Sequence, residues 1–143
     1  MAGAVIALIW LGMLIGVSFL ATPVKFAVQD LALPVALQVG QATFAVFARI
    51  EWLLAATLVA AAALHWRTRR FALTLSLLLA LAVLAQALWL LPILDARVAA
   101  IVAGGTPPSS PHHAYYATIE ALKAVLLGLM ALIGLRTRRG QSQ

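Results

Sequence analysis

Apolar residues fill four long stretches of the chain, and most polar residues lie between these stretches or near their ends. The stretches cover approximately 4–21, 43–64, 71–91 and 112–135. A helix of about 20 apolar residues crosses a hydrocarbon layer roughly 30 Å thick. The pattern therefore predicts an all-α fold, a four-helix transmembrane bundle that forms a single integral membrane domain over residues 1–143.

The first stretch resembles a secretory signal peptide in length, but no Lys or Arg precedes it to form a charged n-region. We therefore expect it to remain as a span. Within it Gly12 and Gly16 form a G-x-x-x-G pair, a spacing that allows two helix backbones to approach closely in lipid. Single matches are common in apolar helices, so ordinary glycine usage explains the pair equally well.

The segment that follows, "TPVKFAVQDLALPVALQVGQ" at 22–41, is too apolar for a free loop. Pro23, Pro34 and Gly40 interrupt it, and both residue types disfavour an unbroken helix. We expect a kinked extension of the first helix or a short interfacial helix lying in the membrane surface.

Composition supports a membrane protein. Hydrophobic residues make up 64% of the chain and charged residues only 10%, whereas soluble domains carry about 25% charged residues. The sequence contains no cysteine, which excludes disulfides, thiolate metal sites and cysteine nucleophiles.

Six arginines account for the formal net charge of +6. Three lie between the second and third stretches and three follow the fourth: Arg67, Arg69, Arg70, Arg136, Arg138 and Arg139. Short basic segments beside spans are typical of the cytoplasmic face. We therefore expect a protein of the bacterial inner membrane with both termini in the cytoplasm. The expected partners are the lipid bilayer and, as alternatives, a second copy of the chain or another membrane protein, but no nucleic acid.

One face of the fourth stretch carries ionisable groups. Its members are spaced by three, four and three residues, which places them on one side of a helix: His113, Tyr116, Glu120 and Lys123. An ionisable side chain at the centre of a bilayer costs about 2.5–3.5 kcal/mol even on the lenient insertion scale. We therefore expect this face to meet other helices or a water-filled cavity rather than lipid.

The second stretch carries Arg49 and Glu51 at a comparable depth from the outer end. We expect a paired network across the second and fourth helices. In it Arg49 and Lys123 neutralise Glu51 and Glu120, and the two remaining members of the polar face form its outer lip. Such a network is either a polar latch that fixes which helices touch, or a binding or conduction site that opens outward.

Three further polar residues belong to the expected outer loop: Asp95, Arg97 and His112. His112 and His113 are adjacent and diverge on a helix, so they cannot both reach one ion. Helical zinc pairs use histidines four residues apart, as in H-E-x-x-H, and that motif is missing.

The remaining metal alternative is a site of His113, Tyr116 and Glu120, which we do not favour. A haem held by two histidines lacks a second ligand at the right depth, because His65 lies at the cytoplasmic end. The sequence also has no Gly-rich phosphate loop and no G-x-S-x-G elbow. We therefore expect no metal, no cofactor and no catalytic residues.

Four short segments, in order along the chain, carry a family resemblance: "WLGMLIGVSF", "VGQATFAVFARIEW", "LWLLPILDAR" and "HHAYYATIEALK". They resemble the TMEM205-like (DUF4149-type) membrane proteins, a domain family of unknown function. The resemblance implies a small four-span helical protein and carries over no catalytic residues. Glu120 and Lys123 depart from the smaller polar groups expected at these positions in eukaryotic relatives.

Two classes of function follow from these observations. The first is a small, non-enzymatic membrane protein whose polar network organises the bundle or a partner interface. The alternative is a small carrier or channel-like protein that uses the same network for a cation, a proton or a polar solute.

Overall fold

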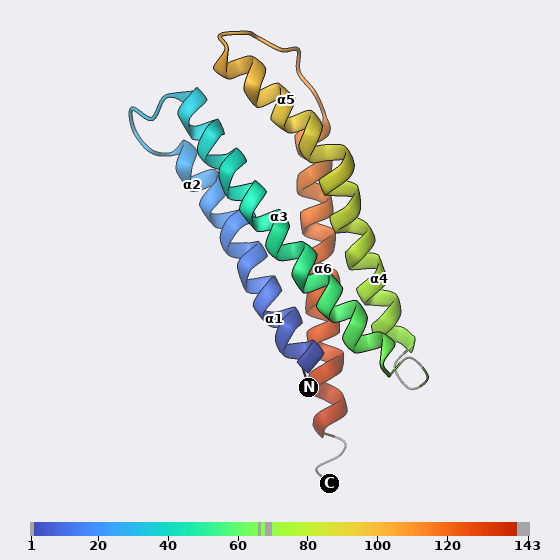
Figure 1. Cartoon of the computed structure of the whole chain (residues 1–143). Helices are drawn as coiled ribbons and strands as arrows, with labels where there is room; N and C mark the ends of the chain where they lie inside the picture. The colour runs from blue at the N-terminus through green and yellow to red at the C-terminus, as the bar shows by residue number, and fades with distance from the viewer. Residues whose placement is uncertain (1, 66, 68–69, 140–143) are drawn as a thin grey trace.

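The computed structural model of the protein describes residues 2–65, 67 and 70–139 (Figure 1). Over these residues all regular structure is helical, and four helical stretches are long and apolar enough to cross a membrane. They are Ala2–Phe26, Leu33–Ala63, Arg70–Val102 and His112–Arg136. The all-α transmembrane bundle that the sequence predicts is confirmed.

Two of the four stretches are built from three consecutive helical segments each. The first comprises α1 (Ala2–Leu14), η1 (Ile15–Ala21) and α2 (Thr22–Phe26), and the third comprises α4 (Arg70–Ala85), η2 (Gln86–Leu90) and α5 (Leu91–Val102). The second and fourth stretches are the single helices α3 (Leu33–Ala63) and α6 (His112–Arg139). Neighbours along the chain run in opposite directions, and both termini lie at one end (Figure 1). We call this the terminal end, and the opposite end, with the α2–α3 and α5–α6 connections, the distal end.

The segments η1 and η2 are π-helical, and each ends two residues before a proline. A proline ring clashes with the carbonyl four residues earlier and offers no N–H to it. For Pro23 that carbonyl belongs to Phe19, and for Pro92 to Leu88, so both carbonyls lie inside the π-helical segments. The wider π turn accommodates the proline, and the helix continues where an α-helix would break.

The helices extend further at the distal end than the hydrophobic pattern predicts. The segment after the first span divides into α2, a turn at 27–32 and the start of α3, so its second half belongs to the second span. The third span continues through Pro92 as far as Val102. It ends where Gly104 adopts a positive φ of 86° and Gly105 N–H donates to Ala100 O at 2.9 Å, a Schellman closure.

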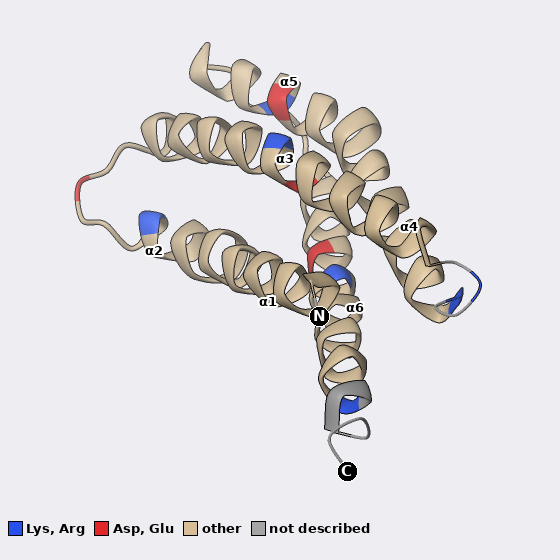
Figure 2. Ribbon diagram, turned by 60° about the horizontal axis from the view of Figure 1, so that its bottom comes forward, with Lys and Arg blue, Asp and Glu red and all other residues tan. Residues whose placement is uncertain are grey.

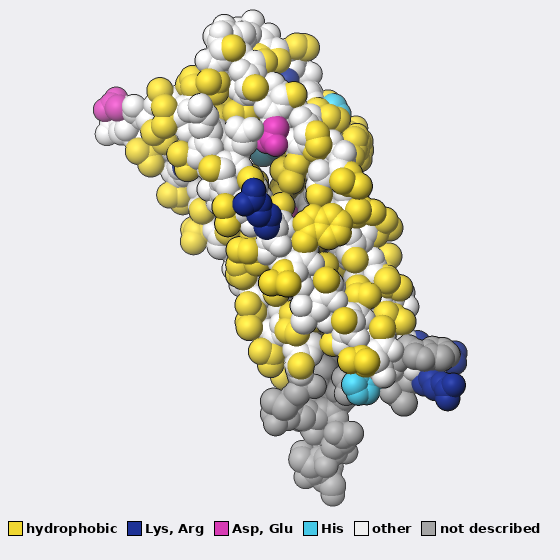
Figure 3. All heavy atoms as spheres, viewed as in Figure 1, with side chains coloured by type: hydrophobic (Ala, Val, Ile, Leu, Met, Phe, Trp, Pro, Cys, Tyr) yellow, Lys and Arg dark blue, Asp and Glu magenta, His cyan; other side chains and the backbone are white. Residues whose placement is uncertain are grey.

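Apolar side chains from all four spans form the core. It comprises Ala7, Trp10, Leu14, Phe47, Ala55, Leu58, Leu75, Leu79, Val83, Leu127, Met130 and Ala131. Many large apolar side chains remain exposed, among them Leu53, Leu64 and Leu88, at 69%, 81% and 70%. Figure 3 shows hydrophobic side chains spread over the visible face of the bundle. A surface of this kind is suited to acyl chains rather than water.

The close contact between α1 and α6 is not at the G-x-x-x-G pair. A Cβ added to Gly12 or Gly16 would meet nothing within 4 Å. A Cβ added to Gly134 on α6 would lie 2.6 Å from the Cβ of Ala4 on α1. The small residues that bring α1 and α6 together are therefore Ala4 and Gly134, near the terminal end.

Candidate functional site: a buried ionic cluster and a distal cavity

Three charged side chains meet inside the bundle. The Lys123 ammonium lies 2.6 Å from Glu51 Oε1 on α3 and 2.6 Å from Glu120 Oε1 on α6. The exposed fractions are 0% for Lys123, 2% for Glu51 and 1% for Glu120, so the group is sealed from its surroundings. In Figure 2 an acidic and a basic position lie next to each other on α6. We call these three residues the ionic cluster.

The other two spans supply hydrogen-bond donors to the ionic cluster. Trp10 Nε1 on α1 donates to Glu51 Oε1 at 2.9 Å, and Ser18 Oγ on η1 donates to Glu120 Oε2 at 2.8 Å. Gln86 Nε2 on η2 donates to Glu120 Oε1 at 2.8 Å. The cluster is thus bound by all four spans, and three neutral donors reinforce the contacts of one ammonium.

Two of these donors come from the π-helical segments. Ser18 belongs to η1 and Gln86 to η2. A π turn holds more residues than an α turn, so it rotates the residues on one side of it relative to those on the other. The segments that accommodate Pro23 and Pro92 are therefore also the segments from which hydroxyl and amide groups reach Glu120.

The charges of the ionic cluster do not cancel when all three groups are ionised. Two carboxylates share one ammonium, which leaves one negative charge inside the bundle. Gln86 Oε1 lies nearby, and within the described part of the chain this buried acceptor receives no hydrogen bond. Uptake of one proton by a carboxylate would remove the surplus charge, because a carboxylic acid is neutral.

Arg49 does not join the ionic cluster, and this part of the predicted network is wrong. Its side chain is exposed, whereas Glu51 on the same helix is buried. Residues two apart on a helix point to nearly opposite sides, so Arg49 and Glu51 cannot both face α6. Among the described residues, Lys123 alone provides the cation for both carboxylates.

Tyr116 and His113, the expected lip, lie one turn apart on α6 and differ in burial. Tyr116 is 5% exposed, and its ring meets the ring of Phe44 edge-on at a centroid distance of 5.3 Å. Its backbone oxygen lies 3.5 Å from Gln86 Nε2, which connects it to the ionic cluster. His113 is exposed, one turn closer to the distal end.

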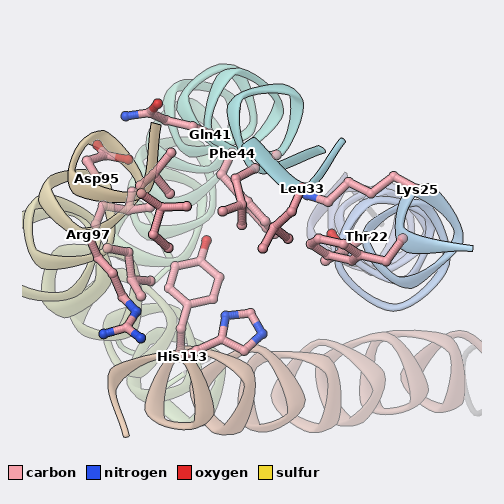
Figure 4. Close-up of a pocket in the computed structure, with 16 residues that line it drawn as sticks. Thr22, Lys25, Leu33, Gln41, Phe44, Asp95, Arg97 and His113 are labelled. Atoms are coloured by element: carbon pink, nitrogen blue, oxygen red, sulfur yellow. The ribbon is translucent and has the colours of Figure 1, made fainter. Parts of the chain in front are cut away.

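A cavity of about 330 Å³ lies on the distal side of Tyr116, between α2, α3, α5 and α6. It exists because α6 begins below the distal ends of α3 and α5, and the 103–111 connection runs back to reach it (Figure 1). Most of its lining is apolar, including Phe26, Leu33, Leu37 and Phe44. We call it the distal cavity (Figure 4).

Several ionisable residues line the distal cavity: Lys25, Asp95, Arg97 and His113. Asp95 and Arg97, expected in a loop, lie on α5 instead. Arg97 is held by the 103–111 connection, because its guanidinium donates to the carbonyls of Pro107 and Pro108. Figure 4 shows Asp95 and Arg97 on one side of the cavity and Lys25 on the other.

His112, the remaining outer polar residue, belongs to a separate aromatic group. Its ring lies 6.4 Å from that of Trp89 and 6.1 Å from that of Tyr115. Ser110 Oγ contacts its Nδ1 and accepts from its backbone N–H at 3.4 Å, which caps α6. Within the part of the chain that the structure describes, no three His, Asp or Glu side chains converge to hold a metal ion.

A second cavity, of about 480 Å³, opens at the terminal end and is lined by residues of α1, α3, α4 and α6. The buried face of α6 passes from one cavity to the other. It presents Tyr116 to the distal cavity and Met130 to the second one, with Glu120, Lys123 and Leu127 between them. On this face Leu127 is the single buried residue between the ionic cluster and the second cavity.

Four contributors to these sites were not singled out as site residues from the sequence: Trp10, Ser18, Lys25 and Gln86. Ser18 and Gln86 are the polar residues of the short segments η1 and η2, five and six positions before a proline. A polar residue shortly before a proline within a span is the sequence pattern that identifies both donors. Trp10 has no such signal in the sequence, because a tryptophan in an apolar span can be buried through the packing of its ring alone. Its exposed fraction is 0%.

Comparison of the chain with known protein families, curated proteins and solved structures finds no match. The resemblance to the TMEM205-like proteins therefore stays a prediction.

Proposed function

We propose that the protein is a small, non-enzymatic integral membrane protein in which the ionic cluster fixes which spans meet and in what register. The observation that carries this proposal is the position of the Lys123 ammonium, 2.6 Å from a carboxylate on each of two helices and fully enclosed. Sliding or rotating α3 against α6 would leave Glu51 without its cation in an apolar interior, which costs several kcal/mol. Moving the first or third span would instead deprive a carboxylate of a neutral hydrogen-bond donor.

The proposal concerns specificity rather than net stability. A buried ion pair often adds little free energy over a well-packed apolar core, because desolvating both charges offsets their attraction. Its effect is to penalise wrong assemblies, and this matters in lipid, where apolar surface contact alone discriminates poorly between helices.

A double-mutant cycle on Lys123 and Glu51 tests this role. Lys123→Met should lower the free energy of unfolding in mixed detergent micelles, because both carboxylates lose their cation. Adding Glu51→Gln should recover part of that loss, because it removes one of the two stranded negative charges. Additive effects of the two substitutions would contradict the proposal.

We further propose that the distal end faces outward from a bacterial inner membrane and that both termini lie in the cytoplasm. The positions of Arg67, Arg70 and Arg136 near the terminal end support this orientation. The absence of cysteine makes single-cysteine labelling clean. Asp30→Cys should react with an impermeant maleimide in intact spheroplasts, and His65→Cys only after permeabilisation. The reverse pattern would overturn the orientation.

A carrier for a proton or small cation is the second candidate. It is favoured by the surplus carboxylate of the ionic cluster and by the two cavities that approach the cluster along α6. In proteoliposomes with a pH-sensitive dye in the lumen, a carrier should dissipate an imposed proton gradient faster than protein-free vesicles. Glu120→Gln should abolish that flux while leaving helicity unchanged. Equal rates with and without protein would exclude proton transport.

A further inference from the structure

We propose that the distal cavity binds an amphipathic monoanion, a carboxylate or phosphate diester group on a short hydrocarbon body. This inference goes beyond the structural role of the ionic cluster and requires no transport. It rests on the shape of the cavity, on one cation without an ion-pair partner, and on the balance of charges along the lining.

The body of the ligand is indicated by the apolar lining. Leu33, Leu37, Leu91, Leu94 and Ile101 surround the space, and Phe44 closes part of it. The volume of about 330 Å³ lies within the range of about 300–1,000 Å³ that is typical of small-molecule sites. A short alkyl chain buries its surface there, while a large polar solute would lose its water without gaining hydrogen bonds.

The anionic group is indicated by Lys25. Its side chain is half-buried, and its ammonium lies 4.9 Å from the ring centroid of Phe26 and 5.9 Å from that of Phe44. No carboxylate among the described residues forms an ion pair with it. A half-buried ammonium beside two aromatic faces is poorly hydrated, so it gains from an anion that reaches it.

Gly40 makes room for this ammonium. A Cβ added to Gly40 would collide with Lys25 Nζ, so the amine occupies the space that a side chain on α3 would otherwise fill. The position of Lys25 over the cavity therefore depends on a glycine in the neighbouring helix.

The other charges of the lining set the charge of the ligand. Asp95 and Arg97 lie on the wall opposite Lys25 and offset one another (Figure 4). Arg97 is engaged by two backbone carbonyls of the adjoining connection, which leaves Lys25 as the cation available to a ligand. The lining thus carries one net positive charge with His113 neutral, and it complements a single negative charge.

The test measures binding of octanoate, methyl octyl phosphate and methyl octanoate by equilibrium dialysis against the full chain in phosphatidylcholine nanodiscs. Empty nanodiscs give the partition of each probe into lipid, which is subtracted. Octanoate or methyl octyl phosphate should bind saturably, and uncharged methyl octanoate should bind much more weakly. Equal binding of methyl octanoate would overturn the anionic specificity.

Variants assign the binding to the distal cavity. Lys25→Met should weaken octanoate binding by about tenfold, the value of one charge-assisted hydrogen bond, and Lys25→Arg should restore most of it. Gly40→Ala should weaken binding while every charge is retained, because the new Cβ displaces the ammonium. Asp95→Asn should tighten binding by about twofold, because it removes a repulsive charge across the cavity.

Arg49→Met is the matched control, because Arg49 is an exposed cation of α3 that does not line the cavity. It should leave octanoate binding unchanged. Circular dichroism and gel filtration establish that each variant is folded. Wild-type affinity in folded Lys25→Met would overturn the proposal, and would mean that Lys25 only extends its ammonium toward the membrane surface.

A further experiment distinguishes two sources of such an anion, a membrane lipid and a soluble amphiphile. If the natural ligand is a lipid headgroup, native mass spectrometry of protein purified from membranes should show an anionic lipid that Lys25→Met loses, and octanoate should compete with it. If the ligand is a soluble amphiphile, no lipid is retained and octanoate binds without competition. Absence of both a retained anionic lipid and saturable octanoate binding would refute the site.

Discussion

Two regions of the bundle join α1 and α6 through different kinds of interaction. Near the terminal end Gly134 lets α6 approach Ala4 of α1. At the ionic cluster the helices are joined through Glu51, which accepts from Trp10 of α1 and pairs with Lys123 of α6. The small-residue contact sets the distance between two backbones, whereas the charged contact determines which side chains must face each other.

The difference matters because lipid solvates apolar side chains as well as a protein core does. Apolar contact therefore holds spans together only where backbones come close enough to gain dispersion energy. A charged group, in contrast, is poorly solvated by hydrocarbon, so it must find its partner within the protein. The following substitutions test this comparison, from the largest expected effect to the smallest.

Lys123→Met should be the most destabilising single change. It strands two carboxylates that are 1–2% exposed, and breaking a buried pair from one side costs about 3–5 kcal/mol. The measurement is the free energy of unfolding in mixed detergent micelles, followed by circular dichroism. A loss below about 1 kcal/mol, the usual effect of a single mutation, would mean that the cluster does not control assembly.

Gly134→Ala should come second. The added Cβ would lie 2.6 Å from that of Ala4, so the two helices must separate, and overpacking of this kind costs about 1–3 kcal/mol. Gly12→Ala is the control, because its Cβ meets nothing within 4 Å and should leave stability unchanged. Equal effects of the two substitutions in the same unfolding assay would show that the contact near the terminal end is not specific.

Glu51→Gln and Glu120→Gln should each cost less than Lys123→Met, at about 1 kcal/mol, because one charge-assisted hydrogen bond weakens while Lys123 keeps a carboxylate. The cluster has two acids and one base, so it tolerates the loss of an acid better than the loss of its base. The comparison uses the same micelles and denaturant series. A loss from either amide variant equal to that of Lys123→Met would contradict this asymmetry.

Arg49→Met should change stability least, within about 0.5 kcal/mol, as is usual for surface positions. Arg49 lies two residues from Glu51 in the sequence, but its side chain is exposed. The variant therefore tests whether closeness along the chain, without contact in the fold, affects stability. Thermal unfolding of this variant should match that of the wild type. A marked loss would mean that the exposed guanidinium has a structural contact.

The sequence predicts the fold well, because runs of apolar residues long enough to cross a bilayer have few alternatives to a helix. It also predicts most of the polar face of α6, because Tyr116, Glu120 and Lys123 are buried there while His113 is exposed. The prediction that Arg49 joins the ionic cluster is wrong, because residues two apart on a helix differ by a rotation of about 200° and face nearly opposite sides.

The cluster's donors and the distal cavity were harder to predict. Ser18 and Gln86 reach Glu120 from π-helical segments, and a helical wheel drawn at a constant angle misplaces every residue beyond such a segment. The distal cavity depends on where α6 begins relative to the ends of α3 and α5, which is set by tertiary packing. Lys25 has a role in the cavity because α3 presents Gly40 opposite it, a pairing of helices that local pattern does not encode.

The ionic cluster also sets an order of biogenesis. The ammonium that pairs with Glu51 belongs to α6, which is translated after the other three spans, so those three spans enter the membrane with that acid still unmatched. Release of the fourth span supplies the missing cation together with a second acid. The ion pairs of the bundle therefore form only after α6 has been translated, and a nascent chain arrested before Lys123 would keep Glu51 without its cation.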